Sequence, residues 1–269
     1  MIEASEVQGR WIAPEARAVF RISGPDRVRY LNGQLSNNVA GPLDRAAIPA
    51  CVCSLKGKVE ALVWVSALGD DLVLDGELRQ RDFILERLDR YLIADDCEIV
   101  DETETLTLVH HFEESGPGVV SRRLAVPGRD RWLRDERHDL REPAEIGEEE
   151  WAVLQIRSGV PESGLEITGG EFPAELGLDT WAVDFHKGCY LGQEVVSRIH
   201  SVGKVKRVLR VIAAEGVVAR DSELRNELGE TGRATRQSLP WREKKSLGFG
   251  LFKRNPDSPQ VAGFEPVMC

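Results

Sequence analysis

Residues 1–112 switch repeatedly between strand-like and helix-like spacing of apolar side chains, which predicts short strands interrupted by amphipathic helices. Two apolar runs around residues 56–58 (Lys-Gly-Lys) predict a hairpin. One short helix is predicted from the spacing of Val28, Leu31 and Leu35, after a capping-box-like start at Ser23, and a second over residues 80–92. The predicted strands are Ala18–Ile22, Cys51–Leu55, Val59–Ala67, Leu72–Asp75, Glu98–Val100 and Leu106–Phe112.

The rest of the chain predicts a mixed region and then a β domain. Residues 113–150 are charged and broken by glycine and proline, which predicts short strands and exposed loops. Helices are predicted over about 148–158 and from Gln193 or Glu194 onward. From Lys204, short apolar runs alternate with turns, which is typical of a small β-barrel. The predicted class is therefore α+β with antiparallel pairing, divided into residues 1–203 and a C-terminal β-barrel domain of residues 204–269.

Composition and charge narrow the class of protein. The chain has 269 residues, 42% of them hydrophobic and 30% charged, as in ordinary globular proteins. Its longest apolar stretch, Ala61–Leu68, is too short to cross a bilayer, and its acidic N-terminus does not resemble a signal peptide, so a cytoplasmic location is expected. The net charge is −10, yet residues 204–269 hold 13 Lys and Arg against 8 Asp and Glu. The acidic bulk argues against binding a nucleic-acid duplex, while the basic C-terminal region leaves a polyanion contact open.

The five cysteines are too few and too scattered for a disulfide framework. Cys51 and Cys53 are two residues apart, so on a strand both side chains face the same side. A metal clip and packing in a core are both compatible with that spacing, and core packing is the prediction, since cysteine behaves as a small hydrophobic residue.

The candidate for chemistry is a glycine-flanked loop at residues 183–203, VDFHKGCYLGQEVVSRIHSVG. Cys189 follows Lys187 and precedes the predicted helix start, and both neighbours favour a thiolate, the form that attacks electrophiles or binds soft metal ions. The alternatives are structural: a cysteine in a glycine loop is commonly a packed small residue, and Glu194 is explained as an acid that complements the helix dipole. The residues alone therefore give a candidate reactive thiol.

Residues 187–194, KGCYLGQE, resemble the signature K-G-C-(F/Y)-x-G-Q-E of the YgfZ family and match it at every specified position. Flanking segments also resemble that family: SGPDRVRYLNGQLSNNV at 23–39, LKGKVEALVWV at 55–65, RSGVPESGLEI at 157–167 and FPAELGLD at 172–179. Beyond residue 200, GETGRATRQS at 229–238 and SLGFGLFKR at 246–254 look like its C-terminal barrel domain. The resemblance thus covers essentially the whole chain.

The resemblance implies a fold similar to that of the glycine-cleavage T-protein, an aminomethyltransferase. Three small domains would then form a ring around a central folate-sized channel, two of them interleaved α+β subdomains within residues 1–203. It also implies a tetrahydrofolate-binding accessory protein for iron–sulfur cluster assembly or repair, and through it for tRNA-modifying cluster enzymes. Its partners would be folate and iron–sulfur client or assembly proteins, without a membrane or a resident metal. Cys189 would be the catalytic residue, and the cofactor-binding residues would be Lys187, Gly188, Tyr190, Gly192, Gln193 and Glu194.

Two other functions stay open. A one-carbon transferase is the first alternative, but the arginine of the T-protein segment L-R-L-E-A-G is replaced here by Gln155. The T-protein's catalytic aspartate also has no counterpart in its expected stretch, where Asp95 and Asp96 come closest and are interpreted as solvated helix-end residues. A non-enzymatic scaffold that binds protein or RNA is the second alternative. It would need aromatic platforms on a basic concave face, whereas the aromatic residues of the C-terminal region are predicted to lie in the barrel core: Trp241, Phe249, Phe252 and Phe264.

Overall fold

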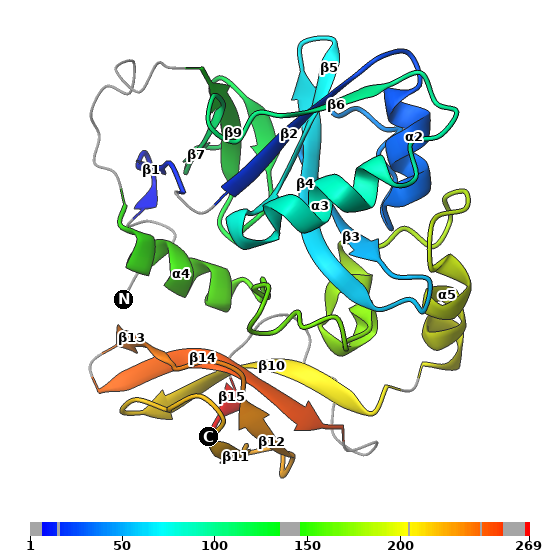
Figure 1. The fold of residues 1–269 in the computed structure, drawn as a ribbon. Helices are drawn as coiled ribbons and strands as arrows, with labels where there is room; N and C mark the ends of the chain where they lie inside the picture. Colours follow the sequence, from blue (N-terminus) through cyan, green and yellow to red (C-terminus); the bar gives the residue numbers. More distant parts are fainter. Residues whose placement is uncertain (1–6, 15–16, 135–145, 204, 243, 255–266) are drawn as a thin grey trace.

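Three antiparallel-rich sheets and a few helices make up the protein in the computed structural model, which describes residues 7–14, 17–134, 146–203, 205–242, 244–254 and 267–269 (Figure 1). The first sheet has the order β3-β4-β5-β2-β6, the second β1-β7-β9-β8, and the third β11-β12-β14-β10-β15 with β13 also paired to β14. The predicted α+β class is confirmed. The division between residues 203 and 204 stays a prediction.

The five-stranded sheet carries a core on each face because the apolar residues of its strands alternate. Its strands are β2 (Arg17–Ser23), β3 (Ile48–Cys53), β4 (Val59–Leu68), β5 (Asp71–Glu77) and β6 (Glu98–Asp101). Helices α2 (Arg27–Gln34) and α3 (Arg81–Asp89) cover one face, where Val52 and Val63 are buried. On the other face Cys51, Cys53 and Trp64 pack against residues 176–183. The prediction that both cysteines pack in a core is confirmed.

The predicted start of the first helix was wrong by one turn. Ser23 still belongs to strand β2, and Asp26 is the N-cap residue, without a side-chain cap. The Asp26 carboxylate instead accepts a hydrogen bond of 2.8 Å from the backbone N–H of Asp96, which holds the segment leading into β6. A tertiary contact therefore takes the oxygen that a local capping pattern assigns to the helix.

The second sheet consists of β1 (Trp11–Ile12), β7 (Thr107–His111), β8 (Val119–Ser121) and β9 (Gly128–Leu133). Its first strand, β1, pairs with β7. The strands of the five-stranded sheet lie between these two in the sequence. Helix α4 (Glu148–Arg157) buries Trp151 and Leu154 toward this sheet, and Val153 and Ile156 toward the third sheet. It therefore lies between the two, as Figure 1 shows. The short strands predicted for 113–150 are confirmed where the structure describes them.

The C-terminal sheet is built around the long antiparallel pair β10 (Arg207–Glu215) and β14 (Lys245–Lys253). Its other strands are β11 (Glu223–Arg225), β12 (Thr231–Ala234), β13 (Leu239–Arg242) and β15 (Val267–Met268). Phe249 and Phe252 are buried in its two cores, and Trp241 packs against the first, as predicted. Phe264 lies outside the described residues.

The segment between α4 and this sheet holds two 3-10 turns, η3 (Pro173–Glu175) and η4 (Leu178–Thr180), and then helix α5 (Gln193–Val202). The predicted start of α5 is confirmed. None of the described helices is long and apolar enough to cross a membrane.

Candidate functional site: a central cavity beside the signature loop

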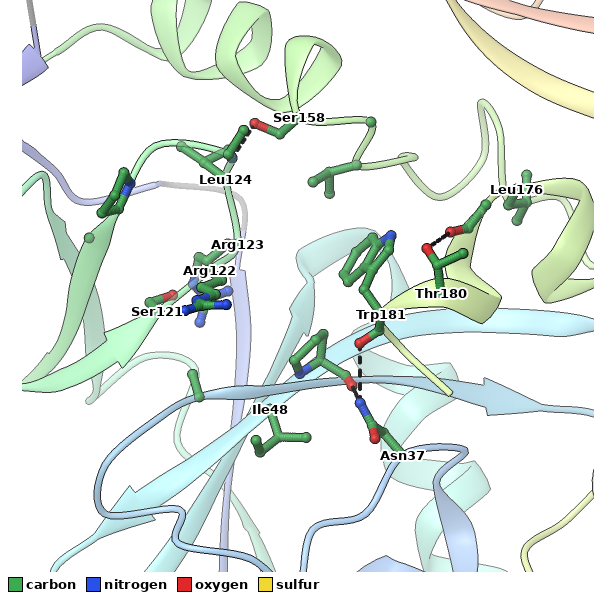
Figure 2. A pocket seen from close by; sticks show the side chains of 18 of the residues that line it. Asn37, Ile48, Ser121, Arg122, Arg123, Leu124, Ser158, Leu176, Thr180 and Trp181 are labelled. Carbon is green, nitrogen blue, oxygen red and sulfur yellow. Dashed lines mark hydrogen bonds between the residues drawn. The ribbon is translucent and has the colours of Figure 1, made fainter. Parts of the chain in front are cut away.

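A cavity of about 1120 Å³ opens where the three sheets approach one another (Figure 2). Its wall includes the start of β3, the loop from β8 to β9, the end of α4, the η3–η4 segment, and strands β10 and β14. This volume is slightly above the usual range of about 300–1,000 Å³ for small-molecule sites. Because every sheet contributes to its wall, the fold as a whole defines the site.

The cavity wall includes a buried network of alternating charges centred on Arg123. Its guanidinium group donates two hydrogen bonds of 2.8 and 2.9 Å to Asp75 and one of 2.8 Å to Asp130. Arg17 also pairs with Asp75, at the Oδ2 atom that accepts one of the Arg123 hydrogen bonds, and the His110 Nδ1 atom lies 2.8 Å from Asp130. Burial raises the pKa of Asp130, but the Arg123 charge and the His110 hydrogen bond outweigh it and hold that pKa well below its usual range. This part of the wall is thus fixed and nearly neutral.

The neighbouring wall residues offer polar groups that nothing in the described structure satisfies. The Ser121 hydroxyl and the Trp181 indole N–H are both buried without a hydrogen-bond partner among the described residues. Arg122 is exposed at the cavity, and no ion pair is found for it in the described part of the chain. Figure 2 shows Trp181 facing the Ser121–Arg123 segment across the cavity. Buried polar groups normally have partners, so the Ser121 hydroxyl and the Trp181 N–H are free to bond to a molecule in the cavity.

Trp181 is held from behind. Its backbone carbonyl accepts a hydrogen bond of 3.2 Å from the Asn37 side-chain amide, which also donates to Pro49 at 2.7 Å. The Trp64 ring lies 6.5 Å from the Trp181 ring, and Arg123 stacks over Trp64 at 4.8 Å. A rigidly supported indole of this kind suits a flat aromatic ligand.

The signature loop packs on the β3–β4 hairpin. Gly192 adopts φ +84°, and a Cβ there would collide with the Ser54 carbonyl, so only glycine fits. Gly57 in the hairpin has φ +71° and lies against Val195 of α5 in the same close way. The Tyr190 ring is buried, and burial raises the pKa of its hydroxyl, which has no partner among the described residues.

Within the signature, Lys187 makes the shortest hydrogen bonds to another element, whereas the Leu191 N–H donates to the Gly33 carbonyl at 3.3 Å. Its ammonium donates to the backbone carbonyls of Asn32, Leu35 and Asn37 at 2.6, 2.7 and 2.8 Å. Burial lowers the pKa of Lys187 to about 8. Because an ammonium has three donors, this one has none left for a ligand or for Cys189.

The other signature residues lie around the start of α5. Gly188 and Cys189 are exposed, Gln193 is the first residue of the helix, and Glu194 is exposed in its first turn. None of the residues 187–194 lines the cavity. The structure therefore brings the signature next to the cavity wall, through Asn37, without placing it inside. The roles predicted for these seven residues stay predictions.

The cavity residues were not foreseen from the sequence. Asn37 stood within a family-like segment without a role, and residues 121–123 fell in a stretch predicted to be short strands and exposed loops. Orphaned donors and buried ion pairs depend on tertiary contacts, which leave no local pattern. Trp181 follows the family-like segment 172–179, which was the nearest signal.

The aspartates considered for transferase chemistry lie elsewhere. Asp95 forms an ion pair of 2.8 Å with Arg29, and Asp96 is exposed. Neither lines the cavity, and neither does Gln155. The one carboxylate among the described lining residues is Glu114, which is exposed.

The fold places the chain in the class of T-protein-like structures. It superposes on the glycine cleavage system aminomethyltransferase T from Bartonella henselae with a TM-score of 0.70, at 12% identity, covering 97% of this chain and 90% of that one. No family model matches. Curated relatives named tRNA-modifying protein YgfZ are 25% identical over 264 residues in Serratia proteamaculans (83% of this chain, 77% of the relative) and 26% over 250 residues in Klebsiella pneumoniae (81% and 76%). The resemblance to the YgfZ family is thereby confirmed.

Proposed function

We propose that this protein binds a reduced folate in its central cavity and supports iron–sulfur cluster assembly or repair, and through it tRNA-modifying cluster enzymes. The observation that carries the proposal is the cavity wall, where the buried Ser121 hydroxyl and Trp181 N–H have no partner among the described residues and lie beside the exposed cation Arg122. Its relatives named tRNA-modifying protein YgfZ and its T-protein fold support the same ligand class.

The lining residues fit the parts of a folate. The Trp181 ring suits stacking against the flat pterin, and the Ser121 hydroxyl can pair with a pterin ring nitrogen or oxygen. Arg122 suits the carboxylates of the glutamate tail, since a guanidinium binds carboxylates in a bidentate way. When bound, the folate would supply one-carbon chemistry. The protein's residues bind and orient it, and the buried Arg123 network keeps the wall rigid.

The alternatives have less support. Aminomethyl transfer needs an acid or base within reach of the reacting nitrogen, and Glu114 is the carboxylate that could provide it. The scaffold alternative needs free cations, yet several arginines of the C-terminal sheet pair with carboxylates: Arg207 with Glu175, Arg210 with Glu230, and Arg236 with Glu166. Iron–sulfur client or assembly proteins are therefore the proposed partners.

The test of ligand binding is a titration with tetrahydrofolate, followed by the melting temperature and by tryptophan fluorescence. A ligand that binds only the folded state stabilises it by about 2.7 kcal/mol at a hundredfold excess over Kd. Trp181→Phe should weaken binding and remove most of the fluorescence change. Trp11→Phe is the matched control, because the Trp11 indole N–H is also buried without a partner among the described residues but does not line the cavity. No response to reduced mono- or polyglutamyl folates would refute the binding proposal.

A further inference from the structure

The ammonium of Lys187 holds a turn that lies far from it in the sequence. Its three acceptors are the carbonyl of Asn32 in the last turn of α2, that of the C-cap residue Leu35, and that of Asn37 beyond the helix. Helix α2 has no basic residue of its own in its last turn. Lys187 thus supplies the positive charge that the carbonyl end of a helix favours, and fixes the path of the chain after it.

That turn in turn supports one wall of the cavity. The Asn37 amide donates to Trp181 and Pro49, and all three residues line the cavity, as Figure 2 shows for Asn37 and Trp181. One residue earlier, the Ser36 hydroxyl donates to the Ala182 carbonyl at 2.6 Å, and the Ser36 backbone carbonyl accepts from the Asp184 N–H at 3.0 Å. The turn at residues 35–37 therefore holds residues 181–184 by hydrogen bonds, and we call this set of contacts the bracket.

Lysine suits this position better than another cation. The three carbonyls converge on one nitrogen, which matches the three donors of an ammonium, whereas a planar guanidinium spreads its donors over a fork. No carboxylate forms an ion pair with Lys187 in the described part of the chain, and Asp184 is the acid whose charge acts on it. The ammonium thus interacts with backbone carbonyls and with the Tyr190 ring, 5.3 Å away, rather than with a paired carboxylate.

We infer that Lys187 is a positioning residue for the cavity: it fixes the 35–37 turn, so that Asn37 holds Trp181 and Pro49 where the ligand packs, and it does not touch the ligand. The inference rests on the proposed folate binding. It gives the lysine of the signature a role that differs from direct cofactor contact, and it links the exposed signature loop to the wall of the cavity.

The test compares Lys187→Met with Lys58→Met. Lys58 is a matched control, because its ammonium also donates to a backbone carbonyl, that of Gly170 at 2.8 Å, but neither Lys58 nor Gly170 lines the cavity. Lys187→Met should raise the Kd for tetrahydrofolate at least about tenfold, as expected when the two wall hydrogen bonds of Asn37 lose their order. Lys58→Met should stay within about twofold of the unmodified protein.

Two further measurements separate this inference from the proposed function. In the ligand-free protein, Lys187→Met should speed hydrogen exchange at the Asp184 amide, which bonds to Ser36. Asn37→Ala keeps the lysine and should lose the same affinity, and the double variant should add little further loss.

If Lys187→Met binds folate normally while Trp181→Phe does not, the positioning role is wrong and folate binding stands. If the unmodified protein binds no folate but exchange at Asp184 still accelerates in Lys187→Met, folate binding is wrong and the bracket stands. Unchanged exchange in Lys187→Met and in Asn37→Ala would overturn the bracket itself.

Discussion

Replacing Arg123 by methionine tests whether the charge network in the cavity wall is a structural requirement. The side chain is 3% exposed and donates to two carboxylates that are themselves buried, Asp75 at 1% and Asp130 at 1%. Methionine fills most of the space but leaves three hydrogen bonds unmade. Asp75 keeps Arg17, whereas Asp130 keeps His110 as its one side-chain partner among the described residues. The substitution therefore leaves a buried negative charge without its main compensation.

The expected loss is about 3–5 kcal/mol in the free energy of unfolding, the range measured when one partner of a buried ion pair is removed. Urea denaturation at pH 7.5, followed by circular dichroism, measures it. The fold lowers the pKa of Asp130. The contribution of Asp130 to the free energy of unfolding is therefore present above its unfolded pKa near 3.8, and it is lost as the pH falls through the lower pKa of the folded state. The difference in the free energy of unfolding between Arg123→Met and the unmodified protein should accordingly become smaller in acid.

The control is Arg233→Met, in which an equally charged side chain is removed from the surface. Arg233 is 65% exposed and its partner Glu223 86% exposed, at 3.4 Å. Exposed pairs contribute about 0–1 kcal/mol, so this variant should denature close to the unmodified protein. If Arg123→Met costs no more than Arg233→Met, the network does not stabilise the wall and the reasoning is refuted.

Four further outcomes are expected. Burial raises the pKa of Glu77 to about 7, although a hydrogen bond from the Ser163 N–H acts in the opposite direction. The contribution of Glu77 to the free energy of unfolding is therefore complete below about pH 4.5, its unfolded pKa, and is lost as the pH rises through 7. Relative to Glu77→Gln, the unmodified protein should lose about 2–3 kcal/mol between pH 5 and pH 9 in urea denaturation; parallel pH profiles would contradict this. Arg122→Gln should weaken tetrahydrofolate about threefold to tenfold by calorimetry and leave a tail-free tetrahydropterin unchanged, and an equal loss for both compounds would remove the assignment to the tail. Cys189→Ala should bind folate normally yet fail to restore cluster-enzyme activity in cells that lack the protein, and full rescue would contradict the role of the thiol. No tetrahydrofolate-dependent ammonia release from the aminomethylated carrier protein of glycine cleavage is expected, and turnover lost in Glu114→Gln would instead establish the transferase.

Local patterns predicted the elements because local physics decides them. The alternation along Val59–Leu68 is the pleat of β4, and the acids of residues 148–150 stand at the N-terminus of α4 as predicted. The predicted capping of α2 was wrong because the Asp26 carboxylate accepts a hydrogen bond from the distant Asp96 N–H, a contact that residue spacing cannot reveal. The signature was found as a motif, but its position outside the cavity was not, since Lys187 reaches its acceptors across about 150 residues of sequence.

The separation of signature and cavity constrains how the proposed activity can work. Cys189 is exposed and lies outside the cavity lining, so the thiol faces molecules that approach from solvent, whereas the folate proposed here would lie in the cavity between the sheets. Group transfer between the two needs the reacting atoms within about 3–3.5 Å of one another, which this arrangement does not provide. In the function proposed here, the surface thiol and the ligand in the cavity therefore act as separate parts, and the wall that receives the ligand is held by the protein's own hydrogen bonds. Lys187 is the residue that joins them, because it belongs to the same loop as the thiol and holds the turn on which Trp181 rests.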